Sequence, residues 1–323
     1  MYDKIGAQAN SFAGLLNATF EEALAEFIRA LPSHRGLVDY ATRTGHRTRP
    51  VGCLLAADAV GGDWRDALDA AVAVELIHKS SVIRDDIADE DSVRSGQAAF
   101  HVKFGVPRAI AVSDLLWTLG LQQTLELPPP VAESCVRALA EMAAGQLEDV
   151  APSLDRGRIE DRRLVEEQKT GVLAELACRL GALIGGGGTE QVAALARYGR
   201  NLGTAFQIFN DVRNLRGEEP ERSAASDLRK RRDTILSAYA RKMGEGEDDH
   251  GRGALAGGHG DLPEEEVRSL QETILSSGAA DFGVRTAMEL MEEARAQLSD
   301  LDPSLASDIL KSLTEDALLS YAF

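Results

Sequence analysis

The chain has 323 residues and a formal net charge of −17, and its composition is 44% hydrophobic and 27% charged. This length can bury a substantial core, and the composition is that of an ordinary soluble globular protein. The negative charge argues against a nucleic-acid partner, which needs a basic surface, and no apolar run approaches the roughly eighteen residues of a membrane span.

Helical periodicity, with apolar residues three and four positions apart, runs through nearly the whole chain. In chain order the clearest expected helices cover residues 17–31, 50–62, 63–91, 165–188 and 189–217. The first is amphipathic, the third is apolar through its middle, and the last two are separated by four glycines. Alternating β patterns are almost absent, so the sequence predicts an all-α fold.

The three cysteines, Cys53, Cys135 and Cys178, are widely spaced and form no C-x-x-C pattern. We expect them to be small buried residues of a cytoplasmic protein, and the first residues do not resemble a signal peptide. A stretch rich in glycine and acidic residues, about 244–262, is expected to be a mobile loop. Because the helical pattern is similar on both sides of it, we expect a single domain over residues 1–323.

A group of carboxylates ends the long expected helix, in the sequence IRDDIADEDSVRSG. Asp85 and Asp89 are four residues apart and face the same way on a helix, with Asp86 beside them. Like charges so placed repel one another and need a cation or open water. Two interpretations stay open: a solvated acidic helix end, or a magnesium site that leaves room for substrate phosphates.

The stretch FQIFNDVRNLRGEE, residues 206–219, carries a second row of oxygen ligands. Asn210, Asn214 and Glu218 are spaced four residues apart, which predicts that they share one helical face. Asp211 is displaced by about 100° around the helix axis. Amide oxygens coordinate hard cations but add no charge, so this row would keep the geometry of a metal site and hold the metal less strongly.

Six segments, in this order, resemble the trans-isoprenyl diphosphate (polyprenyl) synthases. The segments are GHRTRP, ELIHKSSVIRDDIADEDSVRSG, HVKFG, QKTGVLAELACRLGAL, FQIFNDVRNLRGEE and SDLRKRRDTILSAYA. The first, second, fifth and sixth resemble the family's G-K-x-x-R-P, D-D-x-x-D followed by R-R-G, F-Q-x-x-D-D-x-x-D and D-L-x-x-G-K-x-T. The resemblance covers nearly the whole chain.

The resemblance implies the isoprenoid synthase fold, a helical bundle around a deep central apolar cavity, usually as a homodimer. It also implies that two acidic motifs hold three magnesium ions on an allylic prenyl diphosphate, the substrate. The ions would stabilise the departing diphosphate and leave an allylic cation in a dry pocket. In the ordinary enzyme, isopentenyl diphosphate attacks that cation and lengthens the chain by five carbons.

The half of the site that receives the allylic substrate matches the family closely. By position in the motifs, the implied metal ligands are Asp85, Asp86, Asp89, Asn210, Asp211, Asn214 and Glu218. The implied contacts to the allylic substrate are Arg94, Lys169, Thr170, Gln207 and Arg232, the last replacing the family's second lysine. An arginine there keeps the charge and favours bidentate phosphate binding.

The half that receives isopentenyl diphosphate departs from the family. The residues at its four positions are His46, Arg49, His78 and Ser95, so a lysine and an arginine are replaced by an imidazole and a hydroxyl. Each lost phosphate contact would cost roughly 1.5–3 kcal/mol, and affinity could fall about a hundredfold. Lys79 could restore one charge, but helical geometry turns it about 100° from His78, which favours a cation on the helix surface.

Four outcomes therefore stay open, and we favour a terpene synthase-type reaction of a C15–C20 allylic diphosphate without isopentenyl diphosphate. The alternatives are chain elongation, for example to geranylgeranyl diphosphate, prenyl transfer to an acceptor without a diphosphate, and a weakly active partner subunit. Ser80 and Ser81 precede the first aspartate motif, where the family carries bulky residues that limit chain length. Their small size indicates either a deep cavity or close helix packing.

Overall fold

The computed structural model describes residues 6–150, 158–218, 225–244 and 261–321. The described segments are almost entirely helical, so the all-α prediction is confirmed. The elements are α1 (Gly6–Ala30), α2 (Arg35–Thr42), α3 (Thr48–Ala59), a 3-10 turn η1 (Trp64–Ala67), α4 (Leu68–Ala88), β1 (Val93–Arg94), β2 (Gln97–Ala98), α5 (Phe100–Phe104), α6 (Val106–Thr124), α7 (Pro129–Val150), α8 (Ile159–Glu166), a π-helical turn η2 (Glu167–Gly171), α9 (Val172–Ile184), α10 (Thr189–Arg216), α11 (Ser226–Arg229), α12 (Ile235–Met243), α13 (Glu264–Ser276), α14 (Ala279–Ala296) and α15 (Leu305–Tyr321). Most of the stretch expected to be a mobile loop lies outside the described residues, and its mobility and the single domain stay predictions.

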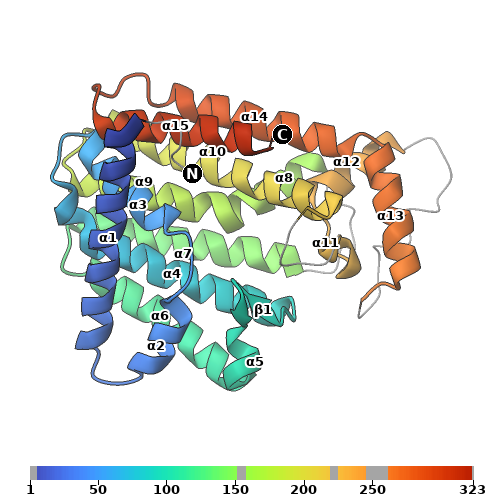
Figure 1. Ribbon diagram of the computed structural model, residues 1–323, viewed down its shortest axis with the longest axis horizontal. Helices are drawn as coiled ribbons and strands as arrows, with labels where there is room; N and C mark the ends of the chain where they lie inside the picture. The colour runs from blue at the N-terminus through green and yellow to red at the C-terminus, as the bar shows by residue number, and fades with distance from the viewer. Residues whose placement is uncertain (1–5, 151–157, 219–224, 245–260, 322–323) are drawn as a thin grey trace.

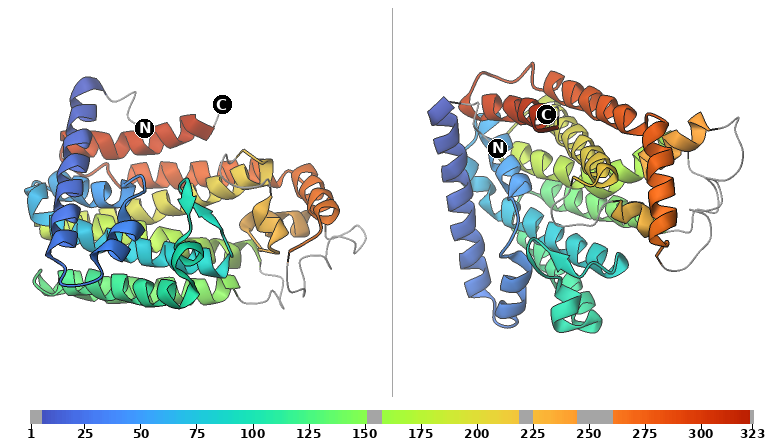
Figure 2. Two further views of the ribbon diagram at one scale, coloured as in Figure 1. Left: turned by 60° about the horizontal axis from the view of Figure 1, so that its bottom comes forward. Right: turned by 45° about the vertical axis from the view of Figure 1, so that its right-hand side comes forward.

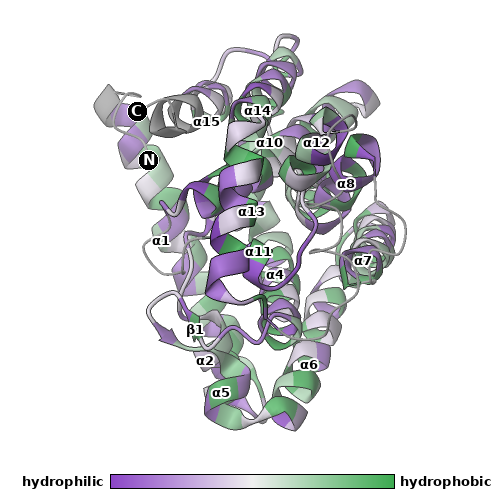
Figure 3. Ribbon diagram, turned by 90° about the vertical axis from the view of Figure 1, so that its right-hand side faces the viewer, coloured by the Kyte–Doolittle hydropathy of each residue, from purple (hydrophilic) through white to green (hydrophobic). Residues whose placement is uncertain are grey.

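The long helices run side by side along the molecule, and α1 crosses one end of them (Figures 1 and 2). In the middle, α9 packs against α3, α7 and α10, while α10 also packs against α14 and α4 packs against α6. Helices α11 and α13 lie at the end opposite α1 (Figure 1). Hydrophilic residues colour much of α8 and of the segments around α13 at that end (Figure 3).

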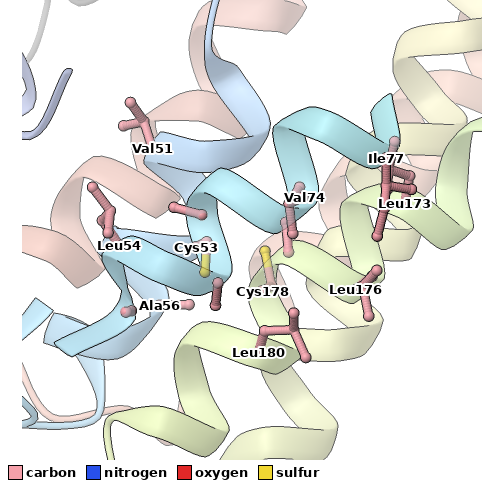
Figure 4. Packing of buried hydrophobic residues seen from close by; sticks show 14 of the residues in the cluster. Val51, Cys53, Leu54, Ala56, Val74, Ile77, Leu173, Leu176, Cys178 and Leu180 are labelled. Atoms are coloured by element: carbon pink, nitrogen blue, oxygen red, sulfur yellow. The ribbon is translucent and has the colours of Figure 1, made fainter. Parts of the chain in front are cut away.

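Two clusters of buried apolar side chains hold these helices together. The larger cluster joins α1, α3, α4, α6, α7 and α9 to the first half of α10, and residues such as Leu54, Ile77 and Leu176 are close to fully buried in it (Figure 4). The smaller cluster joins the second half of α10 to α12, α13 and α14. Each fully buried leucine or isoleucine contributes about 1.5–3 kcal/mol to stability. Helix α10 has buried apolar residues in both clusters, so both hold it in place.

Several element boundaries differ from those that periodicity predicts. The helix expected at 63–91 begins with the 3-10 turn and ends at Ala88, and the one expected at 165–188 is interrupted by the π-helical turn. After α4 the chain forms a short antiparallel hairpin, β1–β2, which the sequence did not predict. Such π-helical turns are often found at functional sites.

Helices α9 and α10 approach each other closely because glycines face the contact. A Cβ atom on Gly203 would lie 2.8 Å from the Ala174 side chain and 3.1 Å from the Thr170 carbonyl oxygen. A Cβ atom on Gly199 would overlap the Ala174 carbonyl oxygen. The two backbones therefore touch directly along this contact.

All three cysteines are buried free thiols, as expected. Burial raises the pKa of Cys178 to about 12, which keeps this thiol protonated and unreactive. Among the described helices, none is both long enough and apolar enough to span a membrane.

Candidate active site

A cavity of about 1430 Å³ runs between α3, α4, α9, α10 and α15. All the residues predicted for the site line it except Asp86 and Ser80. One end is polar and is formed where α4 and α10 end, and the other end is lined by apolar and aromatic side chains, including Leu173, Tyr198 and Leu310. Tyr198 precedes Asp211 by thirteen positions on α10, so the cavity extends about 20 Å along this helix.

The carboxylates at the end of α4 divide into two groups. Asp85 and Asp89 line the cavity, as their shared helical face predicts, and Asp89 forms an ion pair with Arg232. Asp86 is 1% exposed and does not line the cavity. Its carboxylate accepts hydrogen bonds from Arg94 Nε, over 2.8 Å, and from Arg94 Nη2. The interpretation of this group as a solvated helix end is therefore wrong, and Asp86 positions Arg94.

Burial raises the pKa of Asp85, and the positive charge of Lys169 across the cavity opposes this rise. Lys169 itself forms an ion pair with Asp149 of α7. Burial alone would lower the pKa of Lys169, but the charges of Asp149 and Asp85 outweigh it and raise that pKa. Lys169 is therefore protonated and lies between carboxylates of two helices.

A path of hydrogen bonds joins the π-helical turn to α10. The Thr170 hydroxyl donates to the Gln207 side-chain oxygen over 3.1 Å, and the Gln207 amide nitrogen donates to Asp211 Oδ1 over 2.9 Å. The three residues that the resemblance placed in one site thus hold one another in position. Asp211 Oδ2 is buried and accepts no hydrogen bond from an N–H or hydroxyl group of the described residues, and the group that Asp211 meets instead is the carboxyl of Glu166.

Asp211 is paired with Glu166, a residue that sequence reasoning missed. Burial raises the pKa of Glu166 to about 7. Burial and then the charge of Glu166 raise the pKa of Asp211 well above its ordinary value. Two carboxyls buried together cannot both ionise easily without a cation, so the pair retains a proton near neutral pH.

The predicted row of ligands at 210, 214 and 218 does not share one helical face. Helix α10 ends at Arg216, because Gly217 adopts a left-handed conformation with φ of 74°, and this turn takes Glu218 off the helix. Glu218 is exposed but still lines the cavity. The predicted helical spacing therefore holds for Asn210 and Asn214. It does not hold for Glu218, because the helix ends at the glycine before it.

Asn210 and Asn214 have different surroundings. Asn214 is 3% exposed, its amide nitrogen donates to Ser226 Oγ over 2.7 Å, and its oxygen accepts from the Asp227 backbone nitrogen over 3.2 Å. Asn214 therefore ties the start of α11 to α10. Asn210 lines the cavity and is half-buried, and its side chain forms no hydrogen bond within the described residues.

The donor set fits a hard divalent cation that is shared with a diphosphate. In the described parts of the chain, no three aspartate, glutamate, histidine or cysteine side chains lie close enough to hold a metal ion by themselves. Asp85 and Asp89 on one side and Asn210 and Asp211 on the other offer oxygen atoms to the same cavity. Magnesium is commonly bound in this way, through one or two carboxylates, water and substrate phosphates.

The second half of the polar end surrounds Arg49 and His78. The Arg49 Nη1 atom lies 3.4 Å from His78 Nε2, and Arg49 Nε is buried without a hydrogen-bond partner among the described residues. Burial, followed by the charge of Arg49, lowers the pKa of His78 well below its ordinary value, so the ring is neutral. His46 and Ser95, the two departures from the family, also line the cavity here.

The expectation that Lys79 is a cation on the helix surface is wrong. Lys79 is 7% exposed and lines the cavity, with its Nζ atom 2.5 Å from the Thr44 carbonyl oxygen and 3.5 Å from Glu75 Oε1. The direction of a Cβ atom on a helix does not fix where a four-carbon side chain ends.

The two small serines before the aspartates face different surroundings. Ser81 lines the cavity, and its hydroxyl donates to the His78 carbonyl oxygen. Ser80 is fully buried against α6, where its hydroxyl donates to the Ser113 carbonyl oxygen over 2.8 Å. The prediction of a cavity position is therefore wrong for Ser80, whose small side chain serves helix packing.

Comparison with known proteins agrees with this arrangement. The sequence profile of the polyprenyl synthetase family matches residues 32–274. The geranylgeranyl diphosphate synthase of Methanosarcina mazei is 33% identical over 285 residues, which cover 85% of this chain and 83% of that protein.

Two solved structures share the fold over nearly their full lengths. The geranylgeranyl pyrophosphate synthetase of Pyrococcus horikoshii superposes with a TM-score of 0.82 and 29% identity, and 98% of each chain is covered. The polyprenyl synthase of Caulobacter crescentus, solved with calcium and isoprenyl diphosphate, gives a TM-score of 0.88 at 24% identity over 96% of each chain. The predicted isoprenoid synthase fold is confirmed, and the chain belongs to the polyprenyl synthetase family of prenyltransferases.

Proposed function

We propose that this protein is an E-polyprenyl diphosphate synthase that adds isopentenyl diphosphate to an allylic diphosphate, with a product of geranylgeranyl length. Full-length relatives named geranylgeranyl diphosphate synthases support chain elongation better than the terpene synthase-type reaction that we favoured from the sequence. The observation that carries the proposal is a long cavity whose polar end holds two distinct groups of cationic side chains, one around the carboxylates of α4 and one around Arg49. One region suits each diphosphate of an elongation reaction.

The length of the cavity supports the chain length. Each isoprene unit adds roughly 5 Å to an extended chain, so four units span about the 20 Å between Asp211 and Tyr198 on α10. Tyr198 is buried, and its hydroxyl donates to the Leu310 carbonyl oxygen over 2.8 Å, which fixes the ring at the far end of the cavity. The small Ser81 leaves the middle of the cavity open.

The residues of the polar end have separate tasks in this reaction. Asp85, Asp89 and Asp211 would hold magnesium ions, which supply charge stabilisation for the departing diphosphate. Lys169, Arg94 and Arg232 would exchange their carboxylate partners for phosphate oxygens of the allylic substrate.

The apolar walls protect the cation that remains. Leu173, Ala177 and Leu202 line the cavity beyond the polar end and keep water from the allylic carbon. Arg49 and the neutral His78 would position isopentenyl diphosphate so that its double bond attacks that carbon. The bond between the allylic carbon and its diphosphate breaks, a new carbon–carbon bond forms, and a proton passes to the released diphosphate to restore a double bond, so the product is five carbons longer.

One incubation tests the proposal. The purified protein is given magnesium and farnesyl diphosphate, with and without isopentenyl diphosphate, and the products are identified by mass spectrometry. We expect a twenty-carbon diphosphate that forms only when isopentenyl diphosphate is present. A hydrocarbon or alcohol formed in its absence would instead establish the terpene synthase-type reaction. The homodimer, the number of magnesium ions and the cytoplasmic location remain predictions.

A further inference from the structure

We propose that Lys79 binds the diphosphate of isopentenyl diphosphate and supplies the charge that His46 and Ser95 lack. The inference rests on the proposed function, because it assigns a residue to the second substrate of that reaction. It assigns a role to a residue of the second segment that lies at none of the positions to which the resemblance assigns a contact.

The position of the ammonium group is the first argument. Lys79 Nζ lies against the backbone of residues 44 and 45, where it donates to the Thr44 carbonyl oxygen over 2.5 Å. A Cβ atom on Gly45 would lie 2.7 Å from Nζ, so the space for the ammonium group exists because residue 45 has no side chain. The charge of Lys79 is therefore placed next to His46, where the family has its lysine.

The balance of charge around Lys79 is the second argument. Glu75 is the buried carboxylate of this region, and it lies 2.5 Å from Arg47 Nη1 and 3.5 Å from Lys79 Nζ. Arg47 also pairs with Glu21, whose side chain is 45% exposed, while Arg49 Nε has no partner among the described residues. Arg47, Arg49 and Lys79 thus share one buried carboxylate, which leaves a net positive charge that an anion would neutralise.

The hydrogen-bonding capacity of the ammonium group is the third argument. A lysine has three N–H donors. Thr44 accepts one of them, and Glu75 stands at a longer distance and is already bound by Arg47. At least one donor of Lys79 can therefore turn to a phosphate oxygen in the cavity that it lines.

The first experiment compares wild type with Lys79→Met, which keeps the length of the side chain and removes its charge. We expect KM for isopentenyl diphosphate to rise about tenfold or more, while KM for the allylic diphosphate changes less than about twofold. Lys103→Met is the matched control, since Lys103 is exposed on α5, and it should leave both KM values unchanged. Equal rises in both KM values, with a lower Tm, would mean that Lys79 only ties residue 44 to α4 and would overturn the proposal.

The second experiment moves the charge back to the position that the family uses. The double variant Lys79→Met/His46→Lys should recover KM for isopentenyl diphosphate to within about threefold of wild type, because position 46 lines the same cavity and follows Gly45, beside which Lys79 Nζ lies. A purely structural role for the bond to Thr44 predicts no recovery. Failure of this variant to recover, in a protein with wild-type Tm, counts against the proposal.

Calorimetric titration with isopentenyl diphosphate alone separates this proposal from the proposed function. Binding to wild type that weakens about tenfold or more in Lys79→Met supports the role of Lys79 even if no elongated product forms. Undetectable binding to wild type, or equal binding to both proteins, would overturn it. Product formation from farnesyl diphosphate is measured separately and decides the proposed function.

Discussion

Around the carboxylates of α4, the cations Arg94 and Arg232 each contact an aspartate, and Lys169 contacts Asp149. Around Arg49, three cations share the buried carboxylate of Glu75. The first region has more carboxylates than cations, because Asp85 and Asp91 lie there as well, whereas the second carries an excess of positive charge. The same cavity thus contains two regions whose charges are balanced in different ways.

The difference indicates what each region requires of its ligand. In the first, a diphosphate must bring cations with it, because the cations of the protein already have partners and its carboxylates would repel phosphate. In the second, a diphosphate can bind without metal, since it restores neutrality by itself. We therefore expect magnesium dependence in the region around α4 and metal-independent binding in the region around Arg49.

The largest expected effect is that of Asp85→Asn. The substitution removes a carboxylate charge that faces both the cavity and Lys169, so turnover of any allylic diphosphate should fall by at least about a hundredfold. Calorimetric binding of isopentenyl diphosphate should stay within about twofold of wild type, because Asp85 belongs to the other region. Asp302→Asn, at an exposed position, is the matched control. Full activity in Asp85→Asn would refute the assignment of this site.

The pair formed by Glu166 and Asp211 predicts a pH effect on stability. The folded pKa of Glu166, about 7, exceeds its ordinary value of 4.5, so the folded state holds this proton more tightly than the unfolded state does. The contribution to stability is therefore complete below pH 4.5 and is lost as pH rises through about 7.

The test is urea unfolding of wild type and Glu166→Gln without metal between pH 5 and 8. Relative to the variant, the free energy of unfolding of wild type should fall by roughly 2–3 kcal/mol over this range. Magnesium should reduce this loss of stability. A cation bound beside the two carboxylates offsets their repulsion, so the folded state no longer holds the extra proton. Parallel pH profiles for the two proteins would mean that the two carboxyls are not coupled.

Two neighbouring serines allow a comparison of cavity and packing effects. Ser81→Phe places a ring in the cavity and should shorten the product while changing stability little. Ser80→Phe forces a ring against α6 and should lower the free energy of unfolding by about 1–3 kcal/mol or more. Product analysis and urea unfolding of both variants check this, and a shorter product from a stable Ser80→Phe protein would reverse our assignment.

The smallest expected effects concern the two asparagines of α10. Asn210→Asp adds a charge to a cavity position with no side-chain hydrogen bond in the described chain, so it should lower the magnesium concentration for half-maximal activity about threefold. Asn214→Asp places a charge at a buried position, beside Asp227, and should lower stability by about 1–3 kcal/mol without that gain. Equal behaviour of the two variants in magnesium titrations and thermal unfolding would contradict the distinction between them.

Sequence reasoning predicted the fold where side-chain periodicity repeats over several turns. The helix expected at 189–217 corresponds to α10, whereas the one expected at 17–31 covers only the later part of α1, which begins at Gly6. The β1–β2 hairpin could not be predicted, since strands of two residues carry no period. The end of α10 could have been predicted more closely, because glycine is a frequent helix cap.

Within the site, the sequence predicted which motif residues line the cavity but did not predict which side chains they contact. Asp85 and Asp89 line the cavity as helical spacing requires, but nothing local to Lys79 indicates that its side chain lies against residue 44. Asn214 binds residues twelve and thirteen positions further along, and Glu166 meets Asp211 from another helix. Such contacts depend on how helices pack, which a pattern within one helix does not contain.

The close contact between α9 and α10 sets the spacing of the site by main-chain atoms alone. Gly199 and Gly203 bring the two backbones together, and the path from Thr170 to Asp211 crosses this contact a turn further on. Any larger residue at these glycines can only push the helices apart and lengthen that path. The distance between the π-helical turn and α10 is therefore set by backbone van der Waals contact, which has no charge for salt or pH to change.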